Sequence, residues 1–482
     1  MNVSVKYSFV RVFTCAICFG LLNSACHHTT PVAGTVVKLP TKHYQKEVVP
    51  SVQMPSDSGN EIYEKLDHPE AVYQFYRSNN FNIAWLNDSS AALVDSMLFF
   101  LRSVRLYGLL PQDYHKTEIE MLNNRVADKK LLYCKEVLLS DAFLSLTIDL
   151  KYGRLDSIVK ADQDSGALQV LKQAIGNRQI KQVLESQEPI HKSYQLLKVS
   201  LRKILQSSEP ADLHALLAGF TYDSILLHRK VQTIEVNMER WRAESSSLNE
   251  RFVWINIPSY QLQVIENGRT VLESRIIVGK PETTTPVLSS VVECITLFPY
   301  WYIPRKIAIK EYLPEIQKDT SFLTLNNLDV LDRRGTVLDP AILDWKNYNA
   351  NYFPLSLRQR EGPENSLGVI KFVFDNPYAV FLHDTNARNL FRKKVRTFSH
   401  GCIRMEKAID LAKYLVPTPG RIDAVLNFKE RHTINLSNPI PIHIRYFTCE
   451  YSDGVLNFYD DIYKQDAPII QFLYPRMEVK DL

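Results

Sequence analysis

The sequence predicts an α+β fold in which an N-terminal α-helical scaffold domain precedes a β-rich domain with an inserted cap. From residue 59 to about 250, apolar residues recur every three to four positions, as in amphipathic helices. From residue 251 the apolar period changes to two, as in half-buried strands. Residues 305–360 follow neither period and indicate an insertion. Helices that precede strands, instead of alternating with them, favour separate lobes.

The composition is that of a folded protein with nearly balanced charge. The chain has 482 residues, of which 45% are hydrophobic, and a net charge of +4. This length allows about three domains with substantial cores. A charge so close to balance, without a long lysine or arginine run, argues against nucleic acid as a partner. The 24 tyrosines and 22 phenylalanines favour a folded chain over a disordered one.

Residues 1–26 have the features of a signal peptide. Lys6 and Arg11 precede the apolar stretch VFTCAICFGLL, which is too short to span a bilayer comfortably. Small residues before Cys26 make this cysteine a candidate for a lipoprotein-type lipid anchor; a plain cleaved signal and an uncleaved anchor are the alternatives. The proline-containing stretch 27–58 is then a flexible tether. We expect a location in the periplasm or cell envelope, with membrane anchoring if Cys26 is lipidated.

The helical scaffold domain is predicted over residues 59–250. Its first helix places Ala71, Val72, Phe75 and Tyr76 on one face. Similar periodicity appears in AALVDSMLFFLRSVRLYGLLP, in LLYCKEVLLSDAFLSLTIDLKYGRL and in IHKSYQLLKVSLRKILQ. The first of these three stretches ends in glycine and proline, as helices often do.

Strands are predicted from residue 251 onward. RFVWINI alternates apolar residues with polar residues or tryptophan, and ENG at 266–268 is a turn signal. VVECITLFPYW and IKFVFDNPYAVFLHD continue the pattern. We assign residues 251–430 to the β-rich domain, with a cap at about 305–360, and residues 431–482 to a C-terminal β extension.

The stretch FSHGCIRM at 398–405 carries the residues best suited to chemistry. Cys402 is expected just ahead of a short helix, where unpaired N–H groups and the helix dipole would lower the pKa of its thiol. The same N–H groups could stabilise an oxyanion. Gly401 allows a close backbone approach. We therefore predict a cysteine nucleophile; a buried, inert thiol is the alternative.

A thiol nucleophile needs a base, and His383 is the better of two candidates. His383 ends the strand-like YAVFLHD, which is a rigid mount, whereas His400 is as well suited to a structural role. Arg404 could hold the carbonyls of the site or an acidic group of a substrate. A zinc site made by His383, His400 and Cys402 is the alternative, although no conventional ligand spacing supports it.

His-Asp-Thr at 383–385 followed by Ser-His-Gly-Cys-Ile-Arg at 399–404 resembles the catalytic signature of L,D-transpeptidases. GPENSLGVIKFVF, TPVLSS, PYWYIP and VNMERWR are similar to the large branch of that family in Gram-negative bacteria, in which a helical scaffold precedes the catalytic domain. A peptidoglycan-binding-like module often lies between the two, and the short EPADLHALLAGFTYDSILLHRK indicates that it is reduced or absent here.

The resemblance implies a role for each residue of the signature. Cys402 would be the nucleophile and His383 the general base. The backbone amides of His400, Gly401 and Cys402 would form the oxyanion site, with Ser399 supporting the histidine. The resemblance further implies that Trp301 lines the substrate groove beneath the cap; packing in the core is the alternative for this residue. Arg404, at the end of the signature, is the other candidate for binding substrate.

The implied activity is a peptidoglycan L,D-transpeptidase that forms 3→3 cross-links and serves cell-wall biogenesis and cell shape. Its partners would be stem peptides, a donor tetrapeptide and an acceptor side-chain amine, and carbapenems would acylate the cysteine. No metal and no organic cofactor is expected. A cysteine-dependent cell-wall peptide hydrolase or L,D-carboxypeptidase with the same nucleophile is the alternative, and a non-catalytic scaffold protein is a third.

Overall fold

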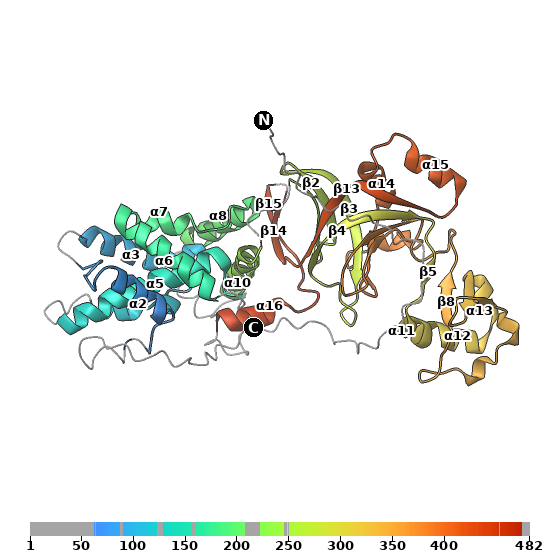
Figure 1. The fold of residues 1–482 in the computed structure, drawn as a ribbon, viewed down its shortest axis with the longest axis horizontal. Coiled ribbons are helices and arrows are strands. Elements are labelled where there is room, and N and C mark those ends of the chain that lie inside the picture. Colours follow the sequence, from blue (N-terminus) through green and yellow to red (C-terminus); the bar gives the residue numbers. More distant parts are fainter. Residues whose placement is uncertain are drawn as a thin grey trace, which may run out of the picture.

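The computed structural model describes residues 62, 64–86, 90–122, 129–155, 160–207, 222–244, 248, 250–452 and 454–474. The predicted signal peptide, Cys26 and the tether lie outside these residues, as does part of the linking stretch 209–230. Figure 1 shows a helical domain and a small cap at opposite ends, with a β-barrel between them. The α+β arrangement predicted from the sequence is therefore confirmed.

The scaffold domain is helical: its helices up to residue 185 surround one apolar core, and its later helices contribute to a second core that they share with the barrel. Helix α2 buries the four residues predicted to share a face. Among the described residues, no helix combines the length and apolar character that crossing a bilayer requires. The elements are α2 (Pro69–Ser78), α3 (Ala91–Ser103), η1 (Val104–Tyr107), η2 (Pro111–Tyr114), α4 (Lys116–Leu122), α5 (Lys129–Tyr152), α6 (Lys160–Asn177), α7 (Ile180–Glu185), α8 (Lys192–Ser207) and α10 (Tyr222–Arg242).

The β-rich domain is a nine-stranded sheet that closes into a barrel, because β2 and β3 pair with each other in addition to their other neighbours. The spatial order is β11 (Thr397–Ser399), β3 (Arg269–Gly279), β12 (Ile403–Met405), β10 (Leu382–His383), β9 (Ile370–Phe374), β4 (Leu288–Leu297), β13 (His432–Arg445), β1 (Arg251–Asn256) and β2 (Gln261–Glu266). Alternate side chains of these strands fill the barrel with isoleucine, valine and leucine. Helices α14 (Ala408–Leu415) and α15 (Arg421–Phe428) follow the signature.

Strand β13 lies in the middle of this sheet, between β4 and β1. The predicted boundary at residue 430 therefore separates a strand from its own barrel, and the β-rich domain extends to Arg445. Sequence alternation found the strand, but it could not reveal which strands would be its neighbours. Among the described residues that follow the barrel, the regular elements are the hairpin of β14 (Cys449–Ser452) and β15 (Val455–Phe458) and helix α16 (Asp466–Leu473).

The cap has a small apolar core of its own. Its sheet has the order β5 (Trp301–Tyr302), β8 (Ser356–Gln359), β6 (Leu328–Leu331) and β7 (Val337–Leu338). Its helical elements are α11 (Arg305–Ile307), the π-helical turn η3 (Ala308–Tyr312), α12 (Leu313–Lys318), α13 (Ser321–Leu325), η4 (Pro340–Ile342) and η5 (Trp345–Asn347). The region predicted as an irregular insertion is thus a folded subdomain.

Helix α10 joins the scaffold to the barrel. Trp241 stacks on Trp254 of β1 with ring centroids 5.4 Å apart, and on Phe447 at 4.7 Å. Asn237 exchanges hydrogen bonds of 2.8 and 2.9 Å with Thr448, close to the C-terminal hairpin. The VNMERWR stretch therefore forms the buried joint between the two domains.

Candidate active site

The predicted base His383 ends β10, and the predicted nucleophile Cys402 immediately precedes the neighbouring strand β12. Leu382 of β10 pairs with Ile403 of β12, and both are fully buried in the barrel core. Side chains alternate along a strand, so the residues beside them project to the opposite face. His383 lies on that face of β10. Arg404, its partner on β12, lies on the same face, as does Cys402 two residues before Arg404.

His383 is held in one tautomer. Its side chain is only 4% exposed, and Nδ1 lies 2.5 Å from the backbone carbonyl oxygen of Asp384. A carbonyl oxygen can only accept, so Nδ1 carries the hydrogen and Nε2 keeps the basic lone pair. Burial, together with the charges of Arg404 and Lys371, lowers the pKa of His383 to about 3. At neutral pH the imidazole is therefore neutral and able to accept a proton.

Asp384 is itself fixed in place, which makes its carbonyl a firm anchor for His383. Its carboxylate accepts hydrogen bonds from the Val369 N–H at 3.1 Å and from Arg388 Nη1 at 2.9 Å. Gly368 has φ +58°, and a Cβ there would lie 2.3 Å from Asp384 Oδ2. Only glycine permits this contact, which explains the glycine of the SLGVIKF stretch.

Cys402 does not lie at a helix N-terminus, and the prediction of a lowered pKa is wrong. Strand β12 follows it, because Ile403 and Met405 alternate into the barrel core, and helix α14 starts only at Ala408. Burial raises the pKa of the Cys402 thiol, opposed by a hydrogen bond from the Phe381 backbone and by the charge of Lys371. The resting pair is thus a thiol and a neutral imidazole.

Ser399 stabilises the loop that presents Cys402. Its hydroxyl donates to the Cys402 carbonyl at 2.5 Å and accepts from the Gly401 N–H at 3.1 Å. The role implied for Ser399, support of a histidine, is therefore replaced by bracing of the loop. Gly401 adopts φ +116°, a conformation that favours glycine. Thr285 Oγ1 donates to the Gly401 carbonyl at 2.9 Å and accepts from the Gly279 N–H at 2.9 Å, which ties the loop to β3.

His400 points toward the cap. Its Nε2 lies 2.7 Å from Oε1 of Glu311 in the π-helical turn, and both side chains are partly exposed. His400 therefore contributes a rim contact between loop and cap, while His383 lies buried on the strand.

Arg404 is a largely buried cation without an acidic partner among the described residues. Its Nε is buried and makes no hydrogen bond there. Its charge lowers the pKa values of His383 and Cys402, and Tyr312 of the cap lies close enough to interact with it electrically. Trp301 packs into the cap core, with its ring centroid 6.1 Å from that of Tyr312. Trp301 thus borders the site through Tyr312.

Four residues near the signature were missed by sequence reasoning: Lys371, Thr285, Glu311 and Tyr312. Lys371 pairs with His383 across β9 and β10, and its Nζ lies 3.9 Å from the centroid of the Phe381 ring. A lysine in the apolar stretch IKFVF was a usable signal for Lys371. No local pattern distinguishes Glu311 or Tyr312, because the tertiary contact of the cap brings them to the loop.

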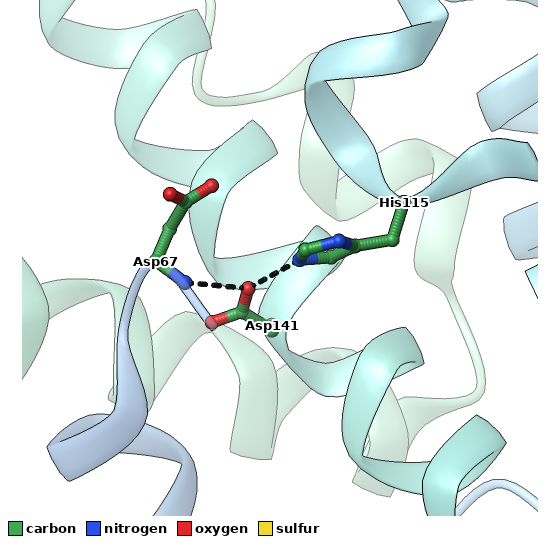
Figure 2. A group of neighbouring side chains, drawn as sticks. All are labelled: Asp67, His115 and Asp141. Atoms are coloured by element: carbon green, nitrogen blue, oxygen red, sulfur yellow. Dashed lines mark hydrogen bonds and ion pairs between the residues drawn. The ribbon is translucent and has the colours of Figure 1, made fainter. Parts of the chain in front are cut away.

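The scaffold contains a separate cluster of potential metal ligands. Asp67, His115 and Asp141 offer ligand atoms within 4.8 Å of one another. The Asp141 carboxylate already accepts hydrogen bonds from the Asp67 N–H at 3.0 Å, the His68 N–H at 2.8 Å and His115 Nε2 at 2.7 Å. Figure 2 shows that the Asp67 backbone N–H and His115 both contact Asp141, whereas no interaction is drawn from the Asp67 carboxylate. These bonds explain Asp141 as an anchor for the start of α2.

The zinc alternative has no assembled site in the barrel. Across the part of the chain that the structure describes, His383, His400 and Cys402 do not bring three ligand atoms as close together as the scaffold cluster does. His383 and His400 instead make separate hydrogen bonds, to Asp384 and Glu311.

A helical scaffold followed by a barrel with cysteine and histidine on one face of adjacent strands defines the class of two-domain L,D-transpeptidases. Residues 250–422 match the L,D-transpeptidase catalytic domain family, YkuD, and residues 70–201 match the Scaffold domain family. The two matched stretches show an L,D-transpeptidase catalytic domain preceded by a scaffold domain, as the resemblance implied.

A curated relative from Haemophilus influenzae supports the assignment. That protein, named "Putative L,D-transpeptidase", is 36% identical over 242 residues, which cover 49% of this chain and 49% of the relative. The chain thus spans about half the length of the relative in this match.

Solved structures of the family resemble the chain only distantly. An L,D-transpeptidase from Mycobacterium smegmatis is 13% identical, with 41% of this chain and 58% of that chain covered and a TM-score of 0.21. L,D-transpeptidase 1 from Mycobacterium tuberculosis is 14% identical, with 41% and 61% covered and a TM-score of 0.17. The assignment rests on the family matches and the Haemophilus relative.

Proposed function

We propose that this protein is a peptidoglycan L,D-transpeptidase that forms 3→3 cross-links through a thioester on Cys402. The observation that carries the proposal is the common face of β10 and β12, where Cys402 accompanies a His383 whose Nε2 is the free basic nitrogen. A thiol and a neutral imidazole that share a face of adjacent strands are the groups that general-base activation of a nucleophile requires.

In the first half-reaction, Sγ of Cys402 attacks the carbonyl between the third residue of a donor stem and its terminal D-alanine. Nε2 of His383 takes the thiol proton as the S–C bond forms. The C–N bond then breaks, and D-alanine leaves with that proton on its amine. In the second half-reaction an acceptor amine attacks the thioester, the C–S bond breaks, and the sulfur regains a proton.

Several groups around Cys402 favour this chemistry. The Gly401 N–H is already bonded to Ser399, so the Cys402 N–H is the stronger candidate for binding the oxyanion. The positive charges of Arg404 and Lys371 favour both the thiolate that forms during attack and a negatively charged donor. Arg404, without an acidic partner in the described structure, is suited to bind a carboxylate of the donor stem.

The cellular setting belongs to the same proposal. Peptidoglycan as substrate fits the family, and export to the periplasm fits the N-terminal pattern of charged, apolar and small residues. Cys26 would then carry a lipid anchor. A role in cell-wall biogenesis and cell shape follows from the cross-linking activity.

Acylation by a carbapenem tests the nucleophile. Intact mass spectrometry should detect a stable adduct on the wild-type protein and none on Cys402→Ala. Cys294→Ala is the matched control, because Cys294 is a second half-buried free thiol, and it should keep the adduct. An adduct of equal yield on Cys402→Ala would remove this thiol from the mechanism.

A muropeptide digest tests the reaction itself. Sacculi treated with the wild-type protein should gain dimers joined 3→3. Trimmed tripeptides without such dimers would instead indicate the hydrolase or carboxypeptidase alternative.

A further inference from the structure

The loop that carries Cys402 also makes a polar contact with the cap. His400 Nε2 lies 2.7 Å from Glu311 Oε1, and the side chains are 31% and 50% exposed. A carboxylate oxygen can only accept, so His400 Nε2 donates this hydrogen bond to Glu311. Glu311 thus brings a solvent-accessible negative charge to the 399–402 loop.

The floor of the site, formed by Arg404 and Lys371, is positively charged, in contrast to Glu311. Arg404 and Lys371 both act on Cys402 and on His383. A carboxylate is attracted to this floor, whereas an ammonium group is repelled by it. A transferase that joins a donor to a cationic amine therefore needs a separate negative position for that amine near the sulfur.

The π-helical turn of the cap supplies this position. Glu311 and Tyr312 are consecutive, yet Glu311 contacts His400 on the rim while Tyr312 interacts with Arg404 on the floor. Single π-helical turns change the direction of side chains relative to an α-helix and are frequent at functional sites. The turn thus places the Glu311 carboxylate beside His400. It places the Tyr312 ring, which packs against Trp301, near Arg404.

We propose that Glu311 and His400 form the acceptor subsite, an inference that rests on the proposed transpeptidase function. Glu311 binds the side-chain ammonium of the acceptor stem, His400 holds Glu311 in place, and the ammonium releases one proton to solvent at this exposed position. The resulting amine attacks the thioester carbonyl, and the new N–C bond replaces the S–C bond. The second amine proton passes through His383 Nε2 to the departing sulfur, which restores the thiol.

The experiment compares two nucleophiles on the preformed acyl-enzyme. Wild type, Glu311→Gln and Glu315→Gln are acylated with a donor tetrapeptide and mixed with either a stem peptide that carries a cationic side-chain amine or hydroxylamine, which is neutral at pH 7.5. Transfer and hydrolysis products are quantified per acylated enzyme. Glu315 is the matched control, because it is a similarly exposed cap glutamate, 46% exposed, that pairs with Lys318 away from the loop.

We expect Glu311→Gln to lower the ratio of transfer to hydrolysis at least tenfold for the cationic amine while hydroxylamine transfer changes less than threefold. Glu315→Gln should keep the wild-type ratios. Equal transfer to the cationic amine in Glu311→Gln and wild type would overturn the inference. Equal losses with both nucleophiles would also overturn it, because they would assign the contact to loop bracing alone.

Failure of the underlying function gives a different result. A wild-type protein that forms no acyl-enzyme would overturn the proposed function, and the acceptor subsite with it. A wild-type acyl-enzyme that only hydrolyses would overturn the acceptor subsite and leave a cysteine hydrolase.

Discussion

Arg404 lies directly opposite His383 on the neighbouring parallel strand, and Lys371 lies opposite His383 on the other side. A histidine between two cations, and 4% exposed, is disfavoured in its protonated form. The structure therefore favours a neutral pair, Cys402 thiol and His383 imidazole, over a preformed thiolate–imidazolium pair. Proton transfer would then accompany the attack on the donor carbonyl.

The neutral pair predicts how alkylation of Cys402 depends on pH. Because burial raises the pKa of this thiol above its ordinary value near 9, its reaction with iodoacetamide should reach half of its maximal rate above pH 9. A second inflection near pH 6.5 should be absent, since the pKa of His383 is lowered to about 3. Mass spectrometry of the Cys402 peptide over a pH series measures both features. A plateau reached below pH 7 would instead indicate a preformed thiolate.

The same shift predicts how stability depends on pH. The folded state depresses the pKa of His383, so the unfolded state binds more protons between about pH 3 and the ordinary value of 6.5. The contribution of His383 to stability is fully present above pH 6.5 and is lost as the pH falls toward 3. Urea unfolding at pH 7.5 and 5 should show a smaller loss of stability in His383→Asn than in wild type. An equal loss in both proteins would contradict this assignment.

His383 as general base predicts a defect in acylation. His383→Asn should slow carbapenem acylation by about 10²- to 10⁴-fold, the range typical of a lost general base. Stopped-flow fluorescence or timed mass spectrometry measures the rate. His432→Asn is the control, because His432 is an exposed imidazole on β13, and it should react like wild type. A His383→Asn rate within threefold of wild type would assign the base to another group.

A substitution at Gly368 is expected to disturb His383, because the backbone at Gly368 packs against Asp384, whose carbonyl orients the imidazole. Gly368→Ala forces a Cβ against Asp384 Oδ2, in a conformation that already costs an alanine about 1–3 kcal/mol. Because the Asp384 carbonyl orients His383, acylation should slow as well. Gly335→Ala controls for the backbone cost, since Gly335 also has positive φ but nothing within 4 Å of an added Cβ. Equal effects of the two substitutions on acylation would show that the contact with Asp384 is unimportant.

The sequence was most informative where periodicity and short-range spacing decide the structure. Helix α2 and the turn between β2 and β3 both lie where local patterns place them. The Cys402 prediction failed because Ile403-Arg404-Met405 was interpreted as the approach to a helix, although the sheet takes those residues as a strand.

The remaining features of the fold and site depend on contacts between residues far apart in the sequence. The position of β13 depends on strands nearly 140 residues apart in sequence, since His432 pairs with Leu297. Likewise, Glu311 comes to the site only because the cap docks against the 399–402 loop. A single sequence contains no local signal for such contacts.

Replacement of Arg404 is expected to increase stability and to decrease activity. Its buried Nε lacks a hydrogen-bond partner in the described structure, and a buried unpaired cation costs folding free energy. Arg404→Met should therefore raise the free energy of unfolding by about 1 kcal/mol or more, as replacement of buried charges often does.

The same change should weaken donor binding and raise the pKa of His383, because it removes a positive neighbour. Denaturant titration and the pH dependence of acylation measure the two effects, and the acid limb should move to higher pH. Arg392→Met, at an exposed position of η6 (Arg388–Arg392), should change neither. A loss of stability together with an unmoved acid limb would mean that Arg404 holds the barrel together and does not tune the site.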